Sequence, residues 1–278
     1  MLTIKAPAKV NLTLEVLGKR PDGFHEVRSV LQTIDLYDTL YIEKGQGFTF
    51  QCHLPGWSAE KSLVSRVLSL LPADFKGGVA VKIEKNIPLM TGLGGDSSDA
   101  AALLKGLNDL YELNISDDNL HKMANELGSD VAFFIKGSTT LVEGRGEKLT
   151  LLPPLKKMWI VLVIPDVPIE SGKTARMYAA LPPSSYSDGV KTTQLVELIK
   201  KGETIESGLL CNAFEDIVLD MYPRLSYYIA GFIRSGVSAH VTGAGPGLFA
   251  IFDDKAQAEN FHKICQDRRV TVHLVATV

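Results

Sequence analysis

Pro88-Leu89-Met90-Thr91-Gly92-Leu93-Gly94-Gly95-Asp96-Ser97-Ser98 is the stretch of this 278-residue sequence that says most about its fold. It follows a predicted strand at residues 79–84 and leads into a predicted helix at residues 98–110. Three glycines allow a tight turn and direct N–H groups into one concavity. Two serines stand at the start of the helix, where unpaired N–H groups and the helix dipole favour an anion. The pattern predicts a cradle for a polyphosphate, with a serine-capped turn that binds no ligand as the alternative.

The same stretch departs from two common phosphate-binding motifs. No lysine follows the glycines, so the stretch is not a loop of the form G-x-x-x-x-G-K-[ST]. Ser97 occupies the place of a third glycine, so it is not G-x-G-x-x-G either. The prediction therefore rests on the glycines and on the start of the helix.

A second glycine cluster, Thr242-Gly243-Ala244-Gly245-Pro246-Gly247, separates apolar strands predicted at residues 238–242 and 248–252. A hairpin turn is one interpretation, yet the cluster is longer than the two residues that can close a hairpin. A loop without side chains can approach a phosphate or a substrate closely. Both interpretations stay open on the residues alone.

Composition and charge exclude several classes of protein. Apolar residues make up 45% of the chain and charged residues 22%, as in ordinary globular proteins. The 29 basic and 32 acidic side chains give a net charge of −3, which argues against a nucleic-acid partner. No apolar run approaches the roughly 20 residues that cross a membrane, and the first residues lack the apolar core of a signal peptide. The three cysteines and six histidines show no metal-ligand or disulfide pattern. We expect a cytoplasmic enzyme without a membrane or nucleic-acid partner.

Strands and helices mix along the chain without a regular repeat, which favours an α+β fold over a doubly wound sheet. A break at residues 152–155, Leu-Pro-Pro-Leu, predicts two domains, 1–153 and 154–278. One helix is predicted between an N-cap at Ser116 and a terminal glycine, Gly128. Further helices are predicted at residues 60–71, 193–200, 223–235 and 256–266. Further strands are predicted at residues 9–16, 27–34, 40–43, 48–52, 158–164 and 270–275.

Seven segments, in order along the chain, resemble motifs of the GHMP kinase superfamily. Three resemble its general motifs: Lys5-Ala6-Pro7-Ala8-Lys9-Val10-Asn11-Leu12, the stretch at residues 88–98 and the loop at residues 242–247. Four more lie at residues 18–26, 31–36, 128–134 and 212–215. These four resemble the members that phosphorylate a CDP-linked methylerythritol in the non-mevalonate (methylerythritol phosphate) isoprenoid pathway.

The resemblance implies a two-domain GHMP kinase fold. Residues 1–153 would form an N-terminal, ATP-binding and catalytic domain like that of ribosomal protein S5. Residues 154–278 would form a C-terminal, ferredoxin-like domain that binds the substrate. The implied reaction uses ATP to phosphorylate the 2-hydroxyl of the CDP-linked methylerythritol, and Mg²⁺ arriving with ATP is the only metal expected. Both a monomer and a homodimer are compatible with this expectation.

The resemblance assigns catalysis to Asp130 and Lys9. The Asp130 carboxylate would take the proton of the substrate hydroxyl, and the Lys9 ammonium would stabilise charge on the transferring phosphoryl group. Asn11 shares a strand face with Lys9 and would reach the substrate. Without the resemblance, the residues favour a solvated strand lysine for Lys9, and Asp130 is equally well a cap for the segment after Gly128.

The remaining site residues follow from the same resemblance. Backbone N–H groups of residues 88–98 would wrap the ATP phosphates, and Lys85 would lie near the nucleotide base unless it is a surface lysine. Phe24 and His25 match an aromatic–histidine pair that recognises cytosine. Tyr178 aligns with an aromatic that stacks on the same ring, and the loop containing Gly243 and Gly245 would contact the substrate.

Two positions depart from the usual pattern of the superfamily members that this chain resembles. Asp96 stands where glycine is usual, and its charge should repel a nearby phosphate unless the side chain points outward, touches Mg²⁺ or caps a helix. Ser62 stands where an asparagine near adenine is usual. Two other functions stay open: a different GHMP small-molecule kinase, such as one for mevalonate or homoserine, and an inactive paralogue that binds a nucleotide or metabolite.

Overall fold

The computed structural model describes the chain except residues 56, 73–74, 169–171 and 267–269. The described residues form two compact units. The first unit contains Met1–Ala8, Leu36–Leu89 and Gly94–Gly137. The second contains Lys9–Asp35, Met90–Leu93 and Ser138–Val278. The units interleave along the chain, and the division into residues 1–153 and 154–278 stays a prediction.

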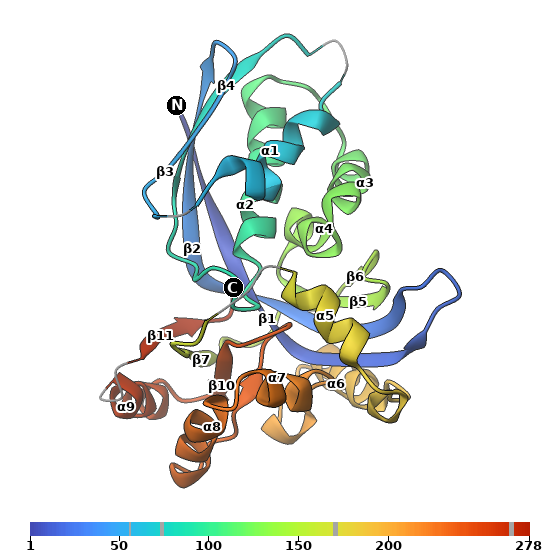
Figure 1. Cartoon of the computed structure of the whole chain (residues 1–278), viewed down its shortest axis with the longest axis vertical. Helices are drawn as coiled ribbons and strands as arrows, with labels where there is room; N and C mark the ends of the chain where they lie inside the picture. Colours follow the sequence, from blue (N-terminus) through green and yellow to red (C-terminus); the bar gives the residue numbers. More distant parts are fainter. Residues whose placement is uncertain (56, 73–74, 169–171, 267–269) are drawn as a thin grey trace. The chain divides into compact units, whose positions relative to one another are not determined.

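The first unit is a twisted sheet with helices on one face (Figure 1). Strand β3 (Phe48–Cys52) runs parallel to β4 (Gly78–Glu84), and β4 pairs antiparallel with the second half of the long strand β2 (His25–Gly45). The start of β1 (Leu2–Lys19) follows next in the strand order. The helices are α1 (Leu63–Val67), α2 (Gly95–Leu110), α3 (Asp117–Leu127) and α4 (Ser129–Lys136), with short 3₁₀ turns at Ala59–Lys61 and Leu68–Leu70.

Helix α2 packs closely on this sheet because its inner face is made of small residues. Ala100, Ala101 and Ala102 are buried in the first half of the helix. A Cβ atom placed on Gly106 would lie 2.5 Å from the Cδ1 atom of Ile42 and 2.7 Å from that of Ile4. Glycine at this position therefore lets the helix backbone approach the strands.

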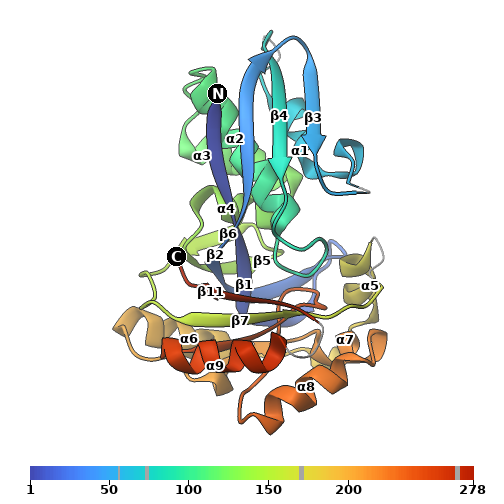
Figure 2. The same cartoon turned by 90° about the vertical axis from the view of Figure 1, so that its left-hand side faces the viewer.

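The second unit contains two groups of strands (Figure 2). The first half of β2 pairs with β5 (Thr139–Gly144), β5 pairs with β6 (Lys148–Leu151), and the second half of β1 runs parallel to β8 (Cys211–Asn212). A separate antiparallel sheet has the order β11 (Thr271–Ala276), β7 (Trp159–Ile164), β10 (Leu248–Phe252) and β9 (His240–Val241). This order is that of a ferredoxin-like domain, as expected.

Helices cover one face of that antiparallel sheet, among them α8 (Leu225–Arg234) and α9 (Lys255–Gln266) (Figures 1 and 2). The unit also contains α5 (Lys173–Ala180), α6 (Val190–Lys201) and α7 (Glu215–Met221), with 3₁₀ turns at Pro183–Ser185 and Ser207–Leu209. Among the described residues, no helix is long and apolar enough to cross a membrane.

The α+β class is confirmed, and the differences from the predicted elements are local. The strands predicted at residues 27–34 and 40–43 are one continuous strand, β2. The helix predicted at residues 60–71 is broken into α1 and two 3₁₀ turns. Helix α2 begins at Gly95, three residues before the predicted start, so that the serines lie inside its first turn. No pattern in the sequence predicts α4, α5, α7, β5, β6 or β8.

Candidate active site

Residues 90–93 of the first glycine stretch contact the second glycine loop within the second unit. The Gly247 N–H donates to the Thr91 carbonyl oxygen at 3.1 Å, and the Thr242 hydroxyl donates to the Gly92 carbonyl oxygen at 3.3 Å. Gly92 has a φ of +86°, and a Cβ atom there would overlap the Thr242 carbonyl oxygen. Only glycine permits both this backbone conformation and this approach. The second loop is therefore part of a two-loop assembly and not an isolated hairpin turn.

Lys9 and Asn11 lie beside this assembly on β1. Lys9 is only 3% exposed, so the alternative of a solvated lysine does not hold. Its ammonium donates to the Asn11 side-chain oxygen at 2.5 Å, and the Asn11 backbone N–H donates to the Thr242 hydroxyl at 3.3 Å. A Cβ atom on Gly243 would lie 3.2 Å from the Lys9 nitrogen. Two separate motifs, one with Lys9 and Asn11 and the other with Gly243, are thus brought together.

Two further side chains, Asn212 and Lys173, bind the second loop, and the sequence alone predicts a role for neither. The Asn212 amide donates to the carbonyl oxygens of Val241 at 2.9 Å and Gly243 at 2.8 Å. Buried Lys173, at the start of α5, donates to the carbonyl oxygen of Met90 at 2.8 Å and to that of Gly245. These contacts join the loop at residues 242–247 to β8, to α5 and to the segment at residues 90–93.

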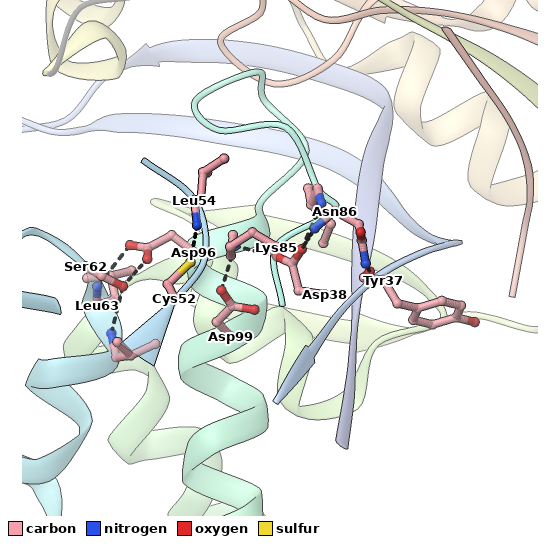
Figure 3. Close-up of polar contacts among 12 residues, drawn as sticks. Tyr37, Asp38, Cys52, Leu54, Ser62, Leu63, Lys85, Asn86, Asp96 and Asp99 are labelled. Atoms are coloured by element: carbon pink, nitrogen blue, oxygen red, sulfur yellow. Dashed lines mark hydrogen bonds and ion pairs between the residues drawn. The ribbon is translucent and has the colours of Figure 1, made fainter. Parts of the chain in front are cut away.

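Asp96 points away from the turn that precedes α2 and contacts the start of α1 (Figure 3). Its carboxylate accepts a hydrogen bond from the Ser62 hydroxyl and another from the Leu63 N–H at 3.0 Å. The outward orientation was one of the three that the sequence left open for Asp96. The two side chains that depart from the usual pattern, Asp96 and Ser62, therefore contact each other.

Lys85 lies in a buried ion cluster behind the start of α2 (Figure 3). Its ammonium pairs with Asp38 and, at 2.6 Å, with Asp99. Asp38 also accepts the N–H groups of Asn86 at 2.6 Å and Ile87 at 2.8 Å. The Lys85 side chain is only 1% exposed, so it is not a surface lysine, and its contact with a nucleotide base stays a prediction.

Burial and neighbouring charges shift the pKa values of this ion cluster in opposite directions. Burial raises the pKa of Asp99 well above the usual range of a carboxyl group, while Lys85 opposes that rise. Burial alone would lower the pKa of Lys85, but Asp99 and Asp38 reverse the effect and raise it. Ser98 Oγ and Asp99 Oδ1 are buried and have no hydrogen-bond partner within the described part of the chain. The first turns of α2 therefore contain two buried polar atoms that could still accept or donate a hydrogen bond.

The first unit contains the other predicted residues of the phosphate cradle. It also contains Asp130, the predicted catalytic base. Gly94 precedes α2 with a φ of +75°, and Gly95, Asp96 and Ser97 form the first turn of α2. Asp130 is half-buried in the first turn of α4, in the first unit, whereas Lys9 belongs to the second. The pairing of Asp130 with Lys9 stays a prediction. So do the nucleotide contacts of Pro88 and Leu89.

His25 and Tyr178, both predicted to contact cytosine, stack on each other in the second unit. Their ring centroids are 5.1 Å apart with planes 26° apart, and Tyr186 approaches His25 edge-on at 6.0 Å. Burial lowers the pKa of His25, and nearby Lys19 adds to the effect, so the neutral ring is favoured. Phe24 is 53% exposed and lies under the Arg145 guanidinium at 5.0 Å rather than in the stack.

The chain is similar to known proteins along its whole length. Models of the GHMP kinases N terminal domain and the GHMP kinases C terminal domain match residues 62–138 and 195–268. A 4-diphosphocytidyl-2-C-methyl-D-erythritol kinase of Dehalococcoides mccartyi is 43% identical over 100% of this chain and 99% of its own length. One of Caldicellulosiruptor saccharolyticus is 37% identical over 92% of this chain and 90% of its own length.

Solved structures show the same fold. A crystal structure of 4-(cytidine 5'-diphospho)-2C-methyl-D-erythritol kinase has a TM-score of 0.83 at 28% identity, covering 99% of both chains. A homoserine kinase from Cytophaga hutchinsonii has a TM-score of 0.77 at 18% identity, over 100% of this chain and 94% of its own, which shows the fold alone. On the identity to relatives along its whole length, this chain belongs to the 4-diphosphocytidyl-2-C-methyl-D-erythritol kinase family of the GHMP kinases.

Proposed function

We propose that this chain transfers the γ-phosphoryl group of ATP to the 2-hydroxyl of 4-diphosphocytidyl-2-C-methyl-D-erythritol. The observation that carries the proposal is the stack of His25 on Tyr178, with Tyr186 at its edge. Flat aromatic groups with a ring nitrogen suit a flat, hydrogen-bonding base such as cytosine. Mevalonate and homoserine have no aromatic ring, so neither could stack on His25 or Tyr178.

In the proposed reaction, Asp130 accepts the proton of the 2-hydroxyl as the phosphoryl group is transferred. Lys9, close to Gly243 and bonded to Asn11, supplies positive charge for the transferring group. The aromatic residues His25 and Tyr178 hold the cytidine end of the substrate, so the 2-hydroxyl is positioned by a contact at the far end of the molecule.

We further propose that the turn before α2 binds the ATP phosphates through backbone N–H groups. The first N–H groups of any α-helix lack acceptors inside the helix, and its dipole favours negative charge. Gly94, with a φ of +75°, forms the turn into the helix without adding a side chain beside those N–H groups. In this scheme residues 1–153 supply the ATP cradle, and residues 154–278 bind the substrate together with His25 of the N-terminal half.

Magnesium is proposed to arrive with the nucleotide. Among the described residues, no group of three His, Cys, Asp or Glu side chains could hold a metal ion. Mg²⁺ keeps several waters and is commonly held by substrate phosphates with one or two protein oxygens. The buried Ser98 hydroxyl, at the base of the cradle, fits this use because no described residue satisfies it. The ion would neutralise charge between the phosphates.

An ADP-release assay tests the proposal, with the CDP-linked methylerythritol, mevalonate and homoserine compared as acceptors. We expect turnover with the first and none with the other two. Turnover with mevalonate or homoserine alone would assign a different GHMP kinase activity. ATP binding without turnover of any acceptor would identify an inactive paralogue and contradict the proposal.

Two substitutions separate chemistry from binding. Asp130→Asn removes the base, and we expect the loss of most turnover with little change in ATP affinity. His25→Ala removes the stack, and we expect the KM for the CDP-linked substrate to rise while the KM for ATP stays the same. Retained turnover in Asp130→Asn would reject the assignment of the base.

A further inference from the structure

Lys173 is a buried cation whose partners are not carboxylates. It is 6% exposed, and its ammonium donates to the carbonyl oxygens of Met90 and Gly245. In the described chain, no acidic side chain forms an ion pair with it. Carbonyl oxygens satisfy hydrogen bonds but leave the charge uncompensated, and buried charges are normally paired. Among the described residues, this lysine therefore has no counter-charge.

A second cation belongs to the same group of residues. Burial lowers the pKa of Lys173 to about 8, and the charge of Lys9 adds to the effect. Lys9 lies close to Gly243, two residues before the Gly245 carbonyl that Lys173 binds. Two lysines therefore adjoin one glycine loop, and their mutual repulsion is relieved if an anion is present.

The two carbonyl partners of Lys173 belong to different loops. Met90 begins the segment at residues 90–93, and Gly245 is in the loop at residues 242–247. An ammonium has three N–H donors in a compact arrangement, so one lysine can hold two loops and still present a third donor to a ligand. Lys173 is thus suited both to fix the loops and to supply charge.

We propose that Lys173 is a positioning residue that joins the two glycine loops and presents its charge, beside that of Lys9, to the phosphate chain of a nucleotide. The inference rests on the proposed function, which supplies two such chains: the triphosphate of ATP and the diphosphate of the CDP-linked substrate. Both have the same chemistry toward an ammonium group, and separate binding measurements distinguish them.

The experiment compares nucleotides with their uncharged nucleosides. Binding of ADP, adenosine, CDP and cytidine is measured for the wild-type chain, Lys173→Met, Lys173→Arg and a control, Lys201→Met, which removes an exposed lysine of the same unit. We expect Lys173→Met to weaken ADP or CDP about tenfold, the usual scale for a lost charged hydrogen bond, and to leave both nucleosides unchanged. Weaker ADP binding would assign Lys173 to the phosphates of ATP, and weaker CDP binding would assign it to the diphosphate of the CDP-linked substrate.

Two additional readouts exclude a purely structural role. Lys173→Arg should restore most nucleotide affinity because it keeps the charge, and binding by Lys173→Met should depend less on salt than binding by the wild type. If Lys173→Met does not fold, Lys173→Gln, which is uncharged but keeps a donor, takes its place. Unchanged affinity for both nucleotides, or equal losses for nucleotides and nucleosides, would overturn the proposal.

These outcomes are independent of turnover. A wild-type chain without activity toward the CDP-linked substrate contradicts the proposed function. The comparison of nucleotides with nucleosides would still decide whether Lys173 holds phosphate.

Discussion

Asp96 and Ser62, the two side chains that depart from the usual pattern of the family, form one hydrogen-bonded pair. The pair joins the first turn of α2 to the start of α1, because Asp96 also accepts the Leu63 N–H. A carboxylate that is engaged in this way is directed away from the proposed phosphate cradle. Its effect on ATP binding should therefore be smaller than its position in the sequence suggests.

We predict that Asp96→Gly leaves the KM for ATP unchanged or lowers it, while it reduces the free energy of unfolding. Loss of the two hydrogen bonds should cost about 1–2 kcal/mol at this half-buried position. Urea unfolding of Asp96→Ala, Ser62→Ala and the double variant should give a coupling energy of about 1 kcal/mol. A large rise in the KM for ATP would show instead that Asp96 contributes to nucleotide binding.

His240 makes stability depend on pH. Burial lowers its pKa from 6.5 to about 4, with nearby Lys191 adding to the effect, and its Nε2 atom has no partner among the described residues. In the unfolded chain His240 takes up a proton near pH 6.5, whereas in the folded chain it does so only near pH 4. The unfolded state therefore gains protons first, and the free energy of unfolding decreases as the pH falls from 6.5 to 4. Between pH 7 and 5, this residue alone should reduce the free energy of unfolding by about 2 kcal/mol.

Urea unfolding at pH 7 and pH 5 checks this expectation. His240→Gln should show a smaller loss of stability between the two pH values than the wild type. His53→Gln, at an exposed position, serves as the control and should keep the wild-type dependence. An identical loss in all three proteins would show that His240 is not responsible.

At the scale of elements, the two glycine loops depend on each other's backbone. Gly92→Ala should both strain a φ of +86° and push a Cβ atom into the Thr242 carbonyl. Gly202→Ala is a matched control because Gly202 has a φ of +68° and nothing within 4 Å of its would-be Cβ atom. We expect Gly202→Ala to cost about 1 kcal/mol of stability and Gly92→Ala about 1–3 kcal/mol more.

Gly92→Ala and Gly202→Ala should also differ in their rates of ADP release. Gly92→Ala displaces the loops that adjoin Lys9, so kcat for ADP release should fall at least about tenfold. Gly202→Ala should keep the wild-type rate. Equal stability and equal rates in the two variants would show that the loops can move apart without consequence.

The sequence predicts elements well where one local pattern dominates. Residues 48–52 and 248–252 alternate or remain apolar over a whole strand, and the structure has the same bounds. The start of α2 was predicted three residues late because Gly95 is a poor helix former, and its place in the helix depends on close packing against Ile87. The helix predicted at residues 60–71 is interrupted, since Ser62 caps a new turn through the Val64 N–H.

Long-range partners explain what the sequence could not predict in the site. His25 and Tyr178 are predicted for one site because each matches a motif of the family, and their rings stack. Lys173 was missed because its partners are carbonyl oxygens 83 and 72 positions away, and a carbonyl oxygen has no sequence signature. Asp38 was missed for a similar reason: its partner Lys85 lies 47 positions away and resembled a surface lysine at a strand end.

At the scale of the whole molecule, β1 and β2 each contribute residues to both compact units. Unfolding of either unit removes strand partners from the other, so the chain should unfold in a single transition. The two tryptophans allow a direct measurement, because Trp57 belongs to the first unit and Trp159, on β7, to the second. In Trp159→Phe only the first unit contributes tryptophan fluorescence, and in Trp57→Phe only the second.

We expect the fluorescence midpoint in urea to coincide with the far-ultraviolet circular dichroism midpoint in each single-tryptophan variant. The two variants should also give similar slopes, because the slope scales with the surface that the whole chain exposes on unfolding. A fluorescence midpoint that precedes the circular dichroism midpoint in only one variant would show that its unit unfolds alone. In that case the shared strands would not be enough to couple the two units.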